Sequence, residues 1–158
     1  LMEVCCIETP IGYAKIVGDH NGITSVSILD KSENASEYIP KSLEDCVTQL
    51  KAYFNNQLRT FDLKLNPEGT LFQKKVWKYL SQIPYGKTVS YLELAKQLGN
   101  AKAIRAVANA NGKNPIWIIT PCHRVIGADG SLTGYAGGLH RKQWLLNHEG
   151  EYKQQTLF

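Results

Sequence analysis

The chain of 158 residues has no long apolar run, and no stretch approaches the roughly 20 apolar residues that a bilayer-spanning helix needs. Its first nine residues lack the basic start and apolar core of a secretory signal. It also lacks the repetitive or biased composition of fibrous, collagen-like and disordered proteins. We therefore expect a globular protein of one domain or two small ones, with no membrane contact.

Cysteine is scarce, with four residues at positions 5, 6, 46 and 122 and no Cys-x-x-Cys pair. A chain long enough to build a core does not need a disulfide framework, so we expect free thiols in a reducing cytoplasm. Cys5, Cys6 and His20 have no fourth ligand at a characteristic spacing, and we expect neither a metal nor a cofactor.

Charge is unevenly distributed along the chain. Residues 1–66 carry six basic and nine acidic side chains, a net charge of −3, whereas residues 67–158 carry twelve and five, a net charge of +7. A basic second part favours an anionic partner, nucleic acid first among them. The net charge alone is weak support for a nucleic-acid partner, because a net charge of this size can also keep a protein soluble.

The first part has the pattern of a small α/β unit. Short strands are predicted over 3–8, 13–17, 23–29 and 61–65. Apolar side chains at helical spacing predict one buried helix face: Leu43, Cys46, Val47, Leu50 and Phe54. Residues 66–69, Asn-Pro-Glu-Gly, are the expected junction between two domains.

The second part is predicted to be mainly helical. Thr70 can cap a helix that ends at Leu80, with an apolar side formed by Phe72, Val76 and Tyr79. Ser90 and Glu93 form a capping box, in which each side chain satisfies an orphan backbone donor of the next helix. Gly99 ends that helix, and another begins near Ala101, which is the outline of a helix-turn-helix.

The second of these helices has two unlike faces. Ile104, Val107 and Ala108 are predicted to pack inward, and the outer face carries Lys102, Arg105 and Asn109. Small alanines around one long cation would let the helix approach a nucleic-acid groove closely. On the helix pattern alone, an ordinary solvated face is the favoured interpretation.

The most informative segment is residues 114–126, an apolar and β-branched run that predicts a buried extended segment. Cys122, His123 and Arg124 interrupt it, and burying them is costly unless they are paired or line a cavity. A cysteine reacts as its thiolate, which needs a base or positive charge nearby. Adjacent side chains of a strand face opposite ways, however, so a core cysteine beside a surface histidine fits this pattern as well.

The string Pro-Cys-His-Arg-Val at 121–125, seven residues after Asn114-Pro115, resembles the signature of the O6-alkylguanine-DNA alkyltransferase family. The resemblance covers residues 69–150 and is looser over 1–66. Further matching strings follow in order: Ile83-Pro84-Tyr85-Gly86, Val89-Ser90-Tyr91, Ala106-Val107, Gly134-Tyr135-Ala136-Gly137-Gly138 and 144–150, Trp-Leu-Leu-Asn-His-Glu-Gly.

The resemblance implies an α+β fold: a small ribonuclease-H-like α/β domain over 1–66, then a mainly helical winged helix-turn-helix domain over 67–158. It implies DNA repair by direct damage reversal, in which a flipped O6-alkylguanine in duplex DNA gives its alkyl group to the protein in a single turnover. O4-alkylthymine is expected as a lesser substrate, and a monomer is expected because one molecule consumes one lesion.

The resemblance also implies the roles of individual residues. Cys122 matches the alkyl acceptor, His123 the residue that draws off the thiol proton through a water, and Glu149 the carboxylate behind it. Asn114 matches a bracing asparagine, and Tyr91 the proton donor to the departing guanine.

Two further groups match on the same basis. Arg105 matches the side chain that replaces the flipped nucleotide in the stack, with DNA contacts expected from Tyr91, Lys102, Ala106 and Asn100. The pocket for the base is expected to involve Trp117, Val125, Tyr135 and Ala136. Ala136 stands where some members have serine, Trp117 is bulkier than its counterparts, and the zinc ligands of some members are not matched.

Two other functions remain as alternatives. A regulator-class DNA-binding module would recognise the lesion without becoming alkylated. A cysteine hydrolase would use Cys122 and His123 with turnover, although it would have no reason to carry a helix-turn-helix.

Overall fold

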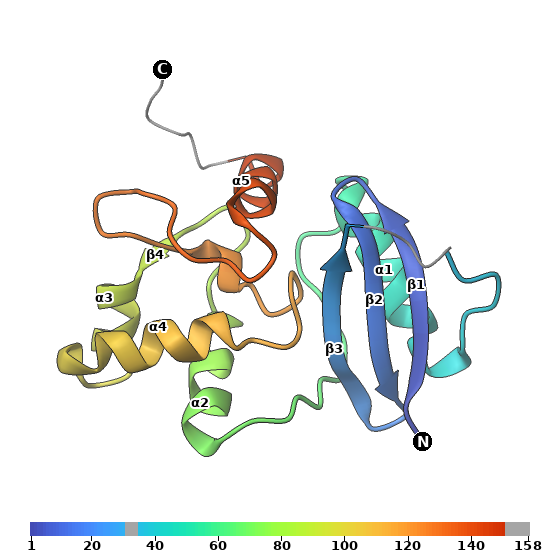
Figure 1. Cartoon of the computed structure of the whole chain (residues 1–158), viewed down its shortest axis with the longest axis horizontal. Coiled ribbons are helices and arrows are strands. Elements are labelled where there is room, and N and C mark those ends of the chain that lie inside the picture. Colours follow the sequence, from blue (N-terminus) through green and yellow to red (C-terminus); the bar gives the residue numbers. More distant parts are fainter. Residues whose placement is uncertain (31–34, 151–158) are drawn as a thin grey trace. The chain divides into compact units, whose positions relative to one another are not determined.

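The computed structural model of the chain describes residues 1–30 and 35–150 (Figure 1). It divides into two compact units: Leu1–Glu68 with Pro115–Ile119, and Gly69–Asn114 with the chain from Thr120 onward. The segment 115–119 joins the first unit because it extends the sheet edge at Val26. There the Val26 N–H donates to Pro115 O at 2.9 Å, and the Trp117 N–H donates to Val26 O at 2.9 Å.

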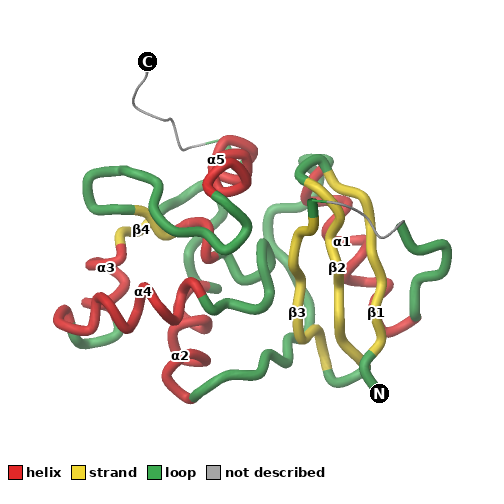
Figure 2. The backbone as a smooth tube through the Cα atoms, viewed as in Figure 1, coloured by secondary structure: helices red, strands yellow, loops and turns green. Residues whose placement is uncertain are grey.

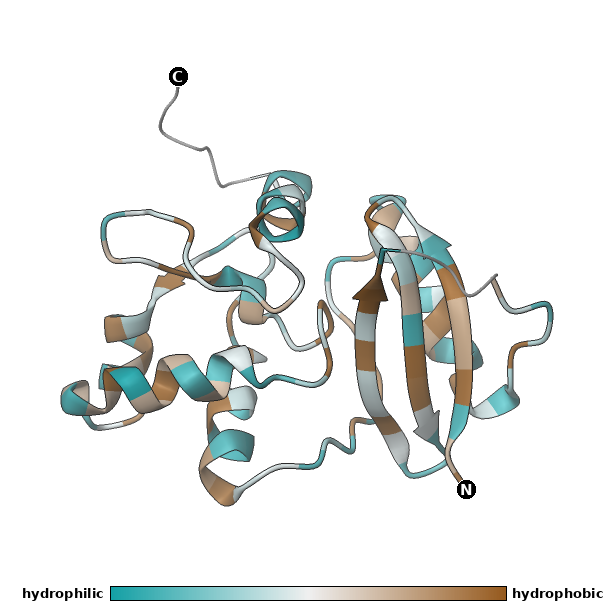
Figure 3. Cartoon of the chain, in the orientation of Figure 1, coloured by the Kyte–Doolittle hydropathy of each residue, from teal (hydrophilic) through white to brown (hydrophobic). Residues whose placement is uncertain are grey.

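The first unit is built on an antiparallel sheet of β1 (Glu3–Thr9), β2 (Gly12–Asp19) and β3 (Gly22–Leu29), in the order β1-β2-β3. Apolar and polar residues alternate along the strands, as the bands in Figure 3 show, so one face of the sheet is buried. After η1 (Lys41–Leu43), helix α1 (Glu44–Phe54) packs on this sheet. Three of the four predicted strands and the helix are confirmed.

Two details of this unit differ from the predictions. Residues 61–65 do not form a strand: Leu65 makes an isolated bridge with Ile23, and the Gln49 side chain pairs with both backbone groups of Asp62. Such side-chain pairing replaces a ladder and leaves no pattern in the local sequence. On α1, the buried aromatic residue is Tyr53 rather than Phe54, which is half-buried. Cys46 fills the core, as expected.

The second unit is mainly helical (Figure 2), and the strands among its described residues are the two-residue parallel strands β4 (Val89–Ser90) and β5 (Val125–Ile126). Its elements outside this pair are α2 (Leu71–Leu80), α3 (Tyr91–Gln97), η2 (Ala101–Ala103), α4 (Ile104–Gly112), η3 (Cys122–Arg124) and α5 (Leu139–His148). Helices α3 and α4 pack together as the predicted helix-turn-helix. No helix among the described residues is long and apolar enough to cross a membrane.

Capping fixes where two of these helices begin. The Ser90 hydroxyl accepts from Glu93 N–H at 3.0 Å, and the Glu93 carboxylate accepts from Ser90 N–H at 2.8 Å. Thr70 and Gln73 form the same reciprocal pair at the start of α2. The predicted capping box is therefore confirmed, and it places Tyr91 at the first position of α3.

The predicted buried faces of α2 and α4 are each partly wrong. Helix α2 buries Val76, Trp77 and Leu80, whereas Phe72 remains 40% exposed and Tyr79 is half-buried. Helix α4 buries Val107 and Ala110, whereas Ile104 is 37% exposed. In α2, Trp77 turns inward because its indole N–H donates to Ala110 O at 2.8 Å.

Candidate active site

Cys122 lies in a single 3-10 turn, not in the extended strand that the sequence pattern predicts. The turn follows Pro121, and the Cys122 N–H donates to Thr120 O at 2.8 Å. In a 3-10 turn, successive side chains point about 120° apart rather than to opposite faces. Cys122, His123 and Arg124 can therefore all face the interior, and each is at most 6% exposed.

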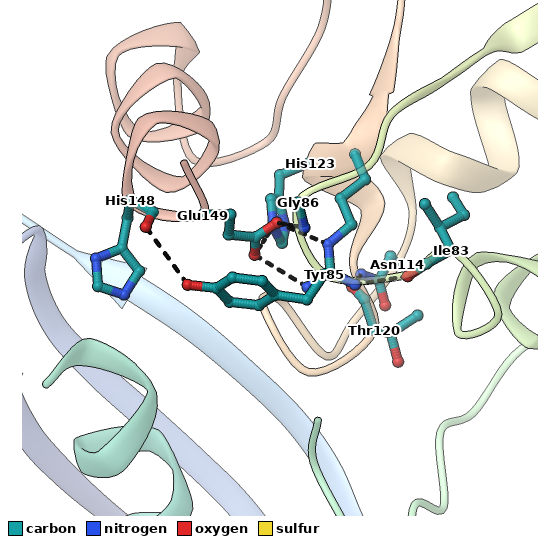
Figure 4. Close-up of polar contacts among 9 residues, drawn as sticks. Ile83, Tyr85, Gly86, Asn114, Thr120, His123, His148 and Glu149 are labelled. Atoms are coloured by element: carbon teal, nitrogen blue, oxygen red, sulfur yellow. Dashed lines mark hydrogen bonds and ion pairs between the residues drawn. The ribbon is translucent and has the colours of Figure 1, made fainter. Parts of the chain in front are cut away.

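Glu149 meets His123 across 26 residues of sequence. It is the C-cap of α5, and its Oε2 lies 2.8 Å from His123 Nε2 (Figure 4). Both side chains are buried, at 0% and 1% exposure. A carboxylate in this position orients an imidazole and stabilises its protonated form.

Arg124 also binds the carboxylate of Glu149, through two of its nitrogens. Its Nε donates to Glu149 Oε1 at 2.8 Å and its Nη2 to Oε2 at 3.0 Å, while Nη1 donates to Ile83 O at 2.7 Å. A bidentate guanidinium contact is strong and directional. It fixes the carboxylate plane so that Oε2 faces His123.

The protonation states follow from these contacts. Burial raises the pKa of Glu149, but its bonds and charge interactions with His123 and Arg124 outweigh burial and hold that pKa far below its usual range. Burial lowers the pKa of His123; Glu149 opposes this shift, while Arg124 and Lys142 add to it. The resting pair is therefore an ionised carboxylate and a neutral imidazole. Since Nε2 carries the proton toward Glu149, Nδ1 holds the basic lone pair, and it has no hydrogen-bond partner within 1–30 and 35–150.

Burial raises the pKa of the Cys122 thiol to about 11. A hydrogen bond from Asn114 and the positive charge of Lys142 oppose this shift only in part. Asn114 is itself fixed, because its Nδ2 donates to Thr120 O at 2.8 Å. The resting cysteine is thus a thiol that needs a base.

A pocket of about 650 Å³ opens between α4 and the loop before α5. Its lining residues are Tyr91, Ile104, Arg105, Ala108, Asn111, Gly112, Thr133, Gly134, Tyr135 and Ala136. Asn111 links the pocket to the cysteine, since its Nδ2 lies 3.5 Å from Cys122 O. The Tyr91 hydroxyl donates to Thr133 O at 3.1 Å, and burial raises its pKa, so the group keeps its proton.

The remaining predicted residues fall in three places. Arg105, Lys102 and Ala106 are exposed on the outer side of the helix-turn-helix, and Asn100 caps η2 by accepting from Lys102 N–H at 3.0 Å. Val125 is fully buried in β5, and Trp117 lies in the segment that belongs to the first unit. Neither is among the described residues that line the pocket, and their contact with a base stays a prediction.

Lys142 is the functional candidate that the sequence reasoning missed. Its side chain is fully buried, and its Nζ donates to Val125 O at 2.6 Å and Thr133 O at 2.8 Å. These bonds tie the loop over the pocket to β5, and burial lowers the pKa of Lys142 to about 8. A signal was available, because Lys142 shares the apolar face of α5 with Leu145 and Leu146.

Among the described residues, no three or more His, Cys, Asp and Glu side chains are grouped as a metal site would require. A buried cysteine, a histidine and a carboxylate behind a pocket on a helix-turn-helix define a class: a thiol nucleophile on a nucleic-acid-binding scaffold.

Comparisons with known proteins name the family. Residues 71–151 match the model of the 6-O-methylguanine DNA methyltransferase DNA-binding domain, and residues 5–67 match that of the ribonuclease-like domain. The chain therefore belongs to the 6-O-methylguanine DNA methyltransferase family. A methylated-DNA–protein-cysteine methyltransferase of Methanosarcina acetivorans is 49% identical over 154 residues, covering 94% of this chain and 99% of the relative.

Solved structures agree with the family and the fold. The Mycobacterium tuberculosis O6-methylguanine methyltransferase superposes with a TM-score of 0.85 at 44% identity, covering 99% of this chain and 97% of that one. The M. tuberculosis protein in complex with DNA gives 0.82 at 45% identity, covering 95% and 94%. The predicted family and α+β fold are confirmed.

Proposed function

We propose that this protein repairs O6-alkylguanine in duplex DNA by moving the alkyl group onto Cys122 in one irreversible step. The observation that carries the proposal is the buried Cys122–His123–Glu149 arrangement beside a pocket on the helix-turn-helix unit. The curated relatives bear the name of the same reaction, and one structural relative was solved with DNA.

The transfer begins with removal of the thiol proton. His123 Nδ1 accepts it, directly or through one water, and Glu149 stabilises the resulting imidazolium. The Cys122 sulfur then attacks the alkyl carbon: the S–C bond forms, the C–O6 bond breaks, and the electron pair stays on the guanine oxygen. The thioether is stable, and no group of the site would hydrolyse it, so each molecule reacts once.

The departing guanine needs a proton to leave as a neutral base. Tyr91 lines the pocket and is protonated at rest, so its hydroxyl is suited to supply that proton once it releases Thr133 O. Tyr135 and Ala136 lie on the loop opposite and would enclose the base. Asn114 would hold the turn that presents the cysteine.

The exposed face of α4 would meet the duplex. Arg105 both lines the pocket and is exposed, which suits a side chain that fills the gap left by a flipped nucleotide. Lys102, Ala106 and Asn100 would contact the backbone nearby, and the net charge of +7 over residues 67–158 favours salt-dependent binding. We further propose O4-alkylthymine as a lesser substrate and a monomer in the cytoplasm as the working form.

The test is a repair assay on a duplex that carries one O6-methylguanine within a restriction site, where methylation blocks cleavage. The proposal expects the protein to restore cleavage of one duplex per molecule and then stop. Cys122→Ser is the matched control and should restore none. Continued turnover would indicate a hydrolase, and tight binding without restoration would indicate a recognition module.

A further inference from the structure

The segment from Ile83 to Gly86, within the connection between α2 and β4, contacts the Arg124–Glu149 pair on a side that the proposed reaction does not use. Ile83 O accepts from Arg124 Nη1 at 2.7 Å, and the Gly86 N–H lies 3.5 Å from Glu149 Oε1. Gly86 adopts a φ of +80°, which lets the backbone turn back toward the carboxylate. The segment thus contacts both members of the ion pair.

Tyr85 occupies the centre of this segment and makes two contacts of its own. Its ring centroid lies 5.7 Å from the Arg124 guanidinium carbon, within the range of a cation–π interaction. Its hydroxyl donates to His148 O at 3.4 Å. His148 is the last residue of α5, where backbone carbonyls lack intrahelical partners, and Glu149 follows directly.

These two contacts act on the same carboxylate from opposite ends. The ring excludes water from one face of the guanidinium, and this strengthens the hydrogen bonds that Arg124 donates to both oxygens of Glu149. The hydroxyl restrains the helix end that carries the Glu149 backbone. If either contact is lost, Glu149 Oε2 has more freedom to leave His123 Nε2.

We propose that Tyr85 is a positioning residue for the alkyl transfer, because its ring and hydroxyl together hold Glu149 against His123. This inference rests on the proposed function and assigns Tyr85 no contact with substrate. Among the described residues, the charged groups that act on His123 are Glu149 at the end of α5, Arg124 on its own turn, and Lys142 from within α5.

The sign of the effect follows from that environment. Arg124 competes with His123 for the charge of Glu149, and burial opposes protonation of the imidazole. Glu149 raises the pKa of His123 against these two influences, and replacing Tyr85 by a smaller side chain loosens Glu149 from the imidazole, so the pKa of His123 should fall further.

The experiment compares wild type with Tyr85→Phe, which loses only the hydroxyl, and Tyr85→Leu, which also loses the ring. Tyr79→Leu is the matched control, since Tyr79 is a half-buried tyrosine that packs against the hydrophobic core of the same unit. Two readouts are taken: single-turnover methyl transfer across pH, and NMR titration of the His123 imidazole, which needs no substrate.

We expect Tyr85→Leu to slow transfer roughly ten- to a hundredfold, the range for small misplacements of catalytic groups. Its acid limb and its His123 titration should both move downward by about half a pH unit or more. Tyr85→Phe should lie between, and Tyr79→Leu should lose stability without moving either curve. An unchanged His123 titration in Tyr85→Leu, or the same movement in Tyr79→Leu, would overturn the inference. If wild type transfers no methyl, the proposed function fails, while the titration still decides whether Tyr85 holds the pair.

Discussion

Replacing Glu149 by glutamine removes one charge from the buried network while keeping its shape. Glu149 faces His123 and Arg124 at 2.8 Å each. Charges about 4 Å apart interact by about 4 kcal/mol at an effective dielectric constant of about 20. The variant loses this support for the imidazolium, and we expect transfer to slow by roughly a hundred- to a thousandfold, within the range of general-base effects.

The same change should destabilise the fold, because it leaves the Arg124 guanidinium buried without a counter-charge. Breaking one side of a buried ion pair costs about 3–5 kcal/mol, a large part of the stability of an ordinary domain. A slow variant could then simply be an unfolded one. The double variant Arg124→Met with Glu149→Gln separates the two effects, since removing both charges is often close to neutral.

Urea denaturation and single-turnover transfer on an O6-methylguanine duplex measure the two effects. We expect Glu149→Gln to lose both stability and rate, and the double variant to regain most of the stability while its rate stays low. If the rate returns together with the stability, Glu149 is a structural residue only, and its part in the proton transfer is refuted.

Three further predictions concern the base, a helix start and the buried lysine. The rate of alkyl transfer by the wild type should change little from about pH 6.5 to 8.5, because His123 stays neutral and the thiol proton moves within the site. In His123→Gln the transfer rate should rise about tenfold per pH unit toward the Cys122 pKa of about 11. Rapid-quench measurements of the transfer distinguish the two pH profiles. Ser90→Ala removes the cap of α3 and should lower the free energy of unfolding by about 1 kcal/mol in urea denaturation, and a loss below about 0.3 kcal/mol would contradict the cap. The pKa of Lys142 is about 8 in the folded protein against an ordinary value of 10.5, so between these pH values the unfolded chain binds more protons than the folded one. The free energy of unfolding of the wild type, measured relative to Lys142→Met, should therefore rise by about 3 kcal/mol from pH 8 to 10.5. A difference that stays constant with pH would refute the shift.

Local patterns in the sequence predict local structure well. Ser90 and Glu93 specify a helix start within four residues, and the reciprocal hydrogen bonds are those that the capping box predicts. The strands of the first unit follow from the alternation of apolar and polar residues. The motif around Cys122 also predicts which residue types gather at the site.

What the sequence does not predict depends on distant partners. Arg124 and Glu149 are 25 residues apart, and no periodic pattern in the sequence indicates that the Nε and Nη2 of the arginine both donate to the carboxylate. The segment at Cys122 departs from a strand because the Arg124 N–H donates to Pro121 O at 3.0 Å and the Val125 N–H donates to Cys122 O, which closes a 3-10 turn inside an apolar run. Charged side chains are expected at the protein surface, but Lys142 is buried. Its burial is explained by the hydrogen bonds that its Nζ donates to the carbonyls of Val125 and Thr133.

We expect Cys122, and none of the other three cysteines, to receive the alkyl group. Cys5, Cys6 and Cys46 are buried in the first unit, and burial raises the pKa values of Cys5 and Cys46 to about 11 and 12. The decisive measurement is peptide mass spectrometry after reaction with a duplex bearing one deuterium-labelled O6-methylguanine. We expect one labelled methyl group per protein molecule, on the peptide that contains Cys122. A label on another cysteine, or no label despite lesion binding, would contradict it.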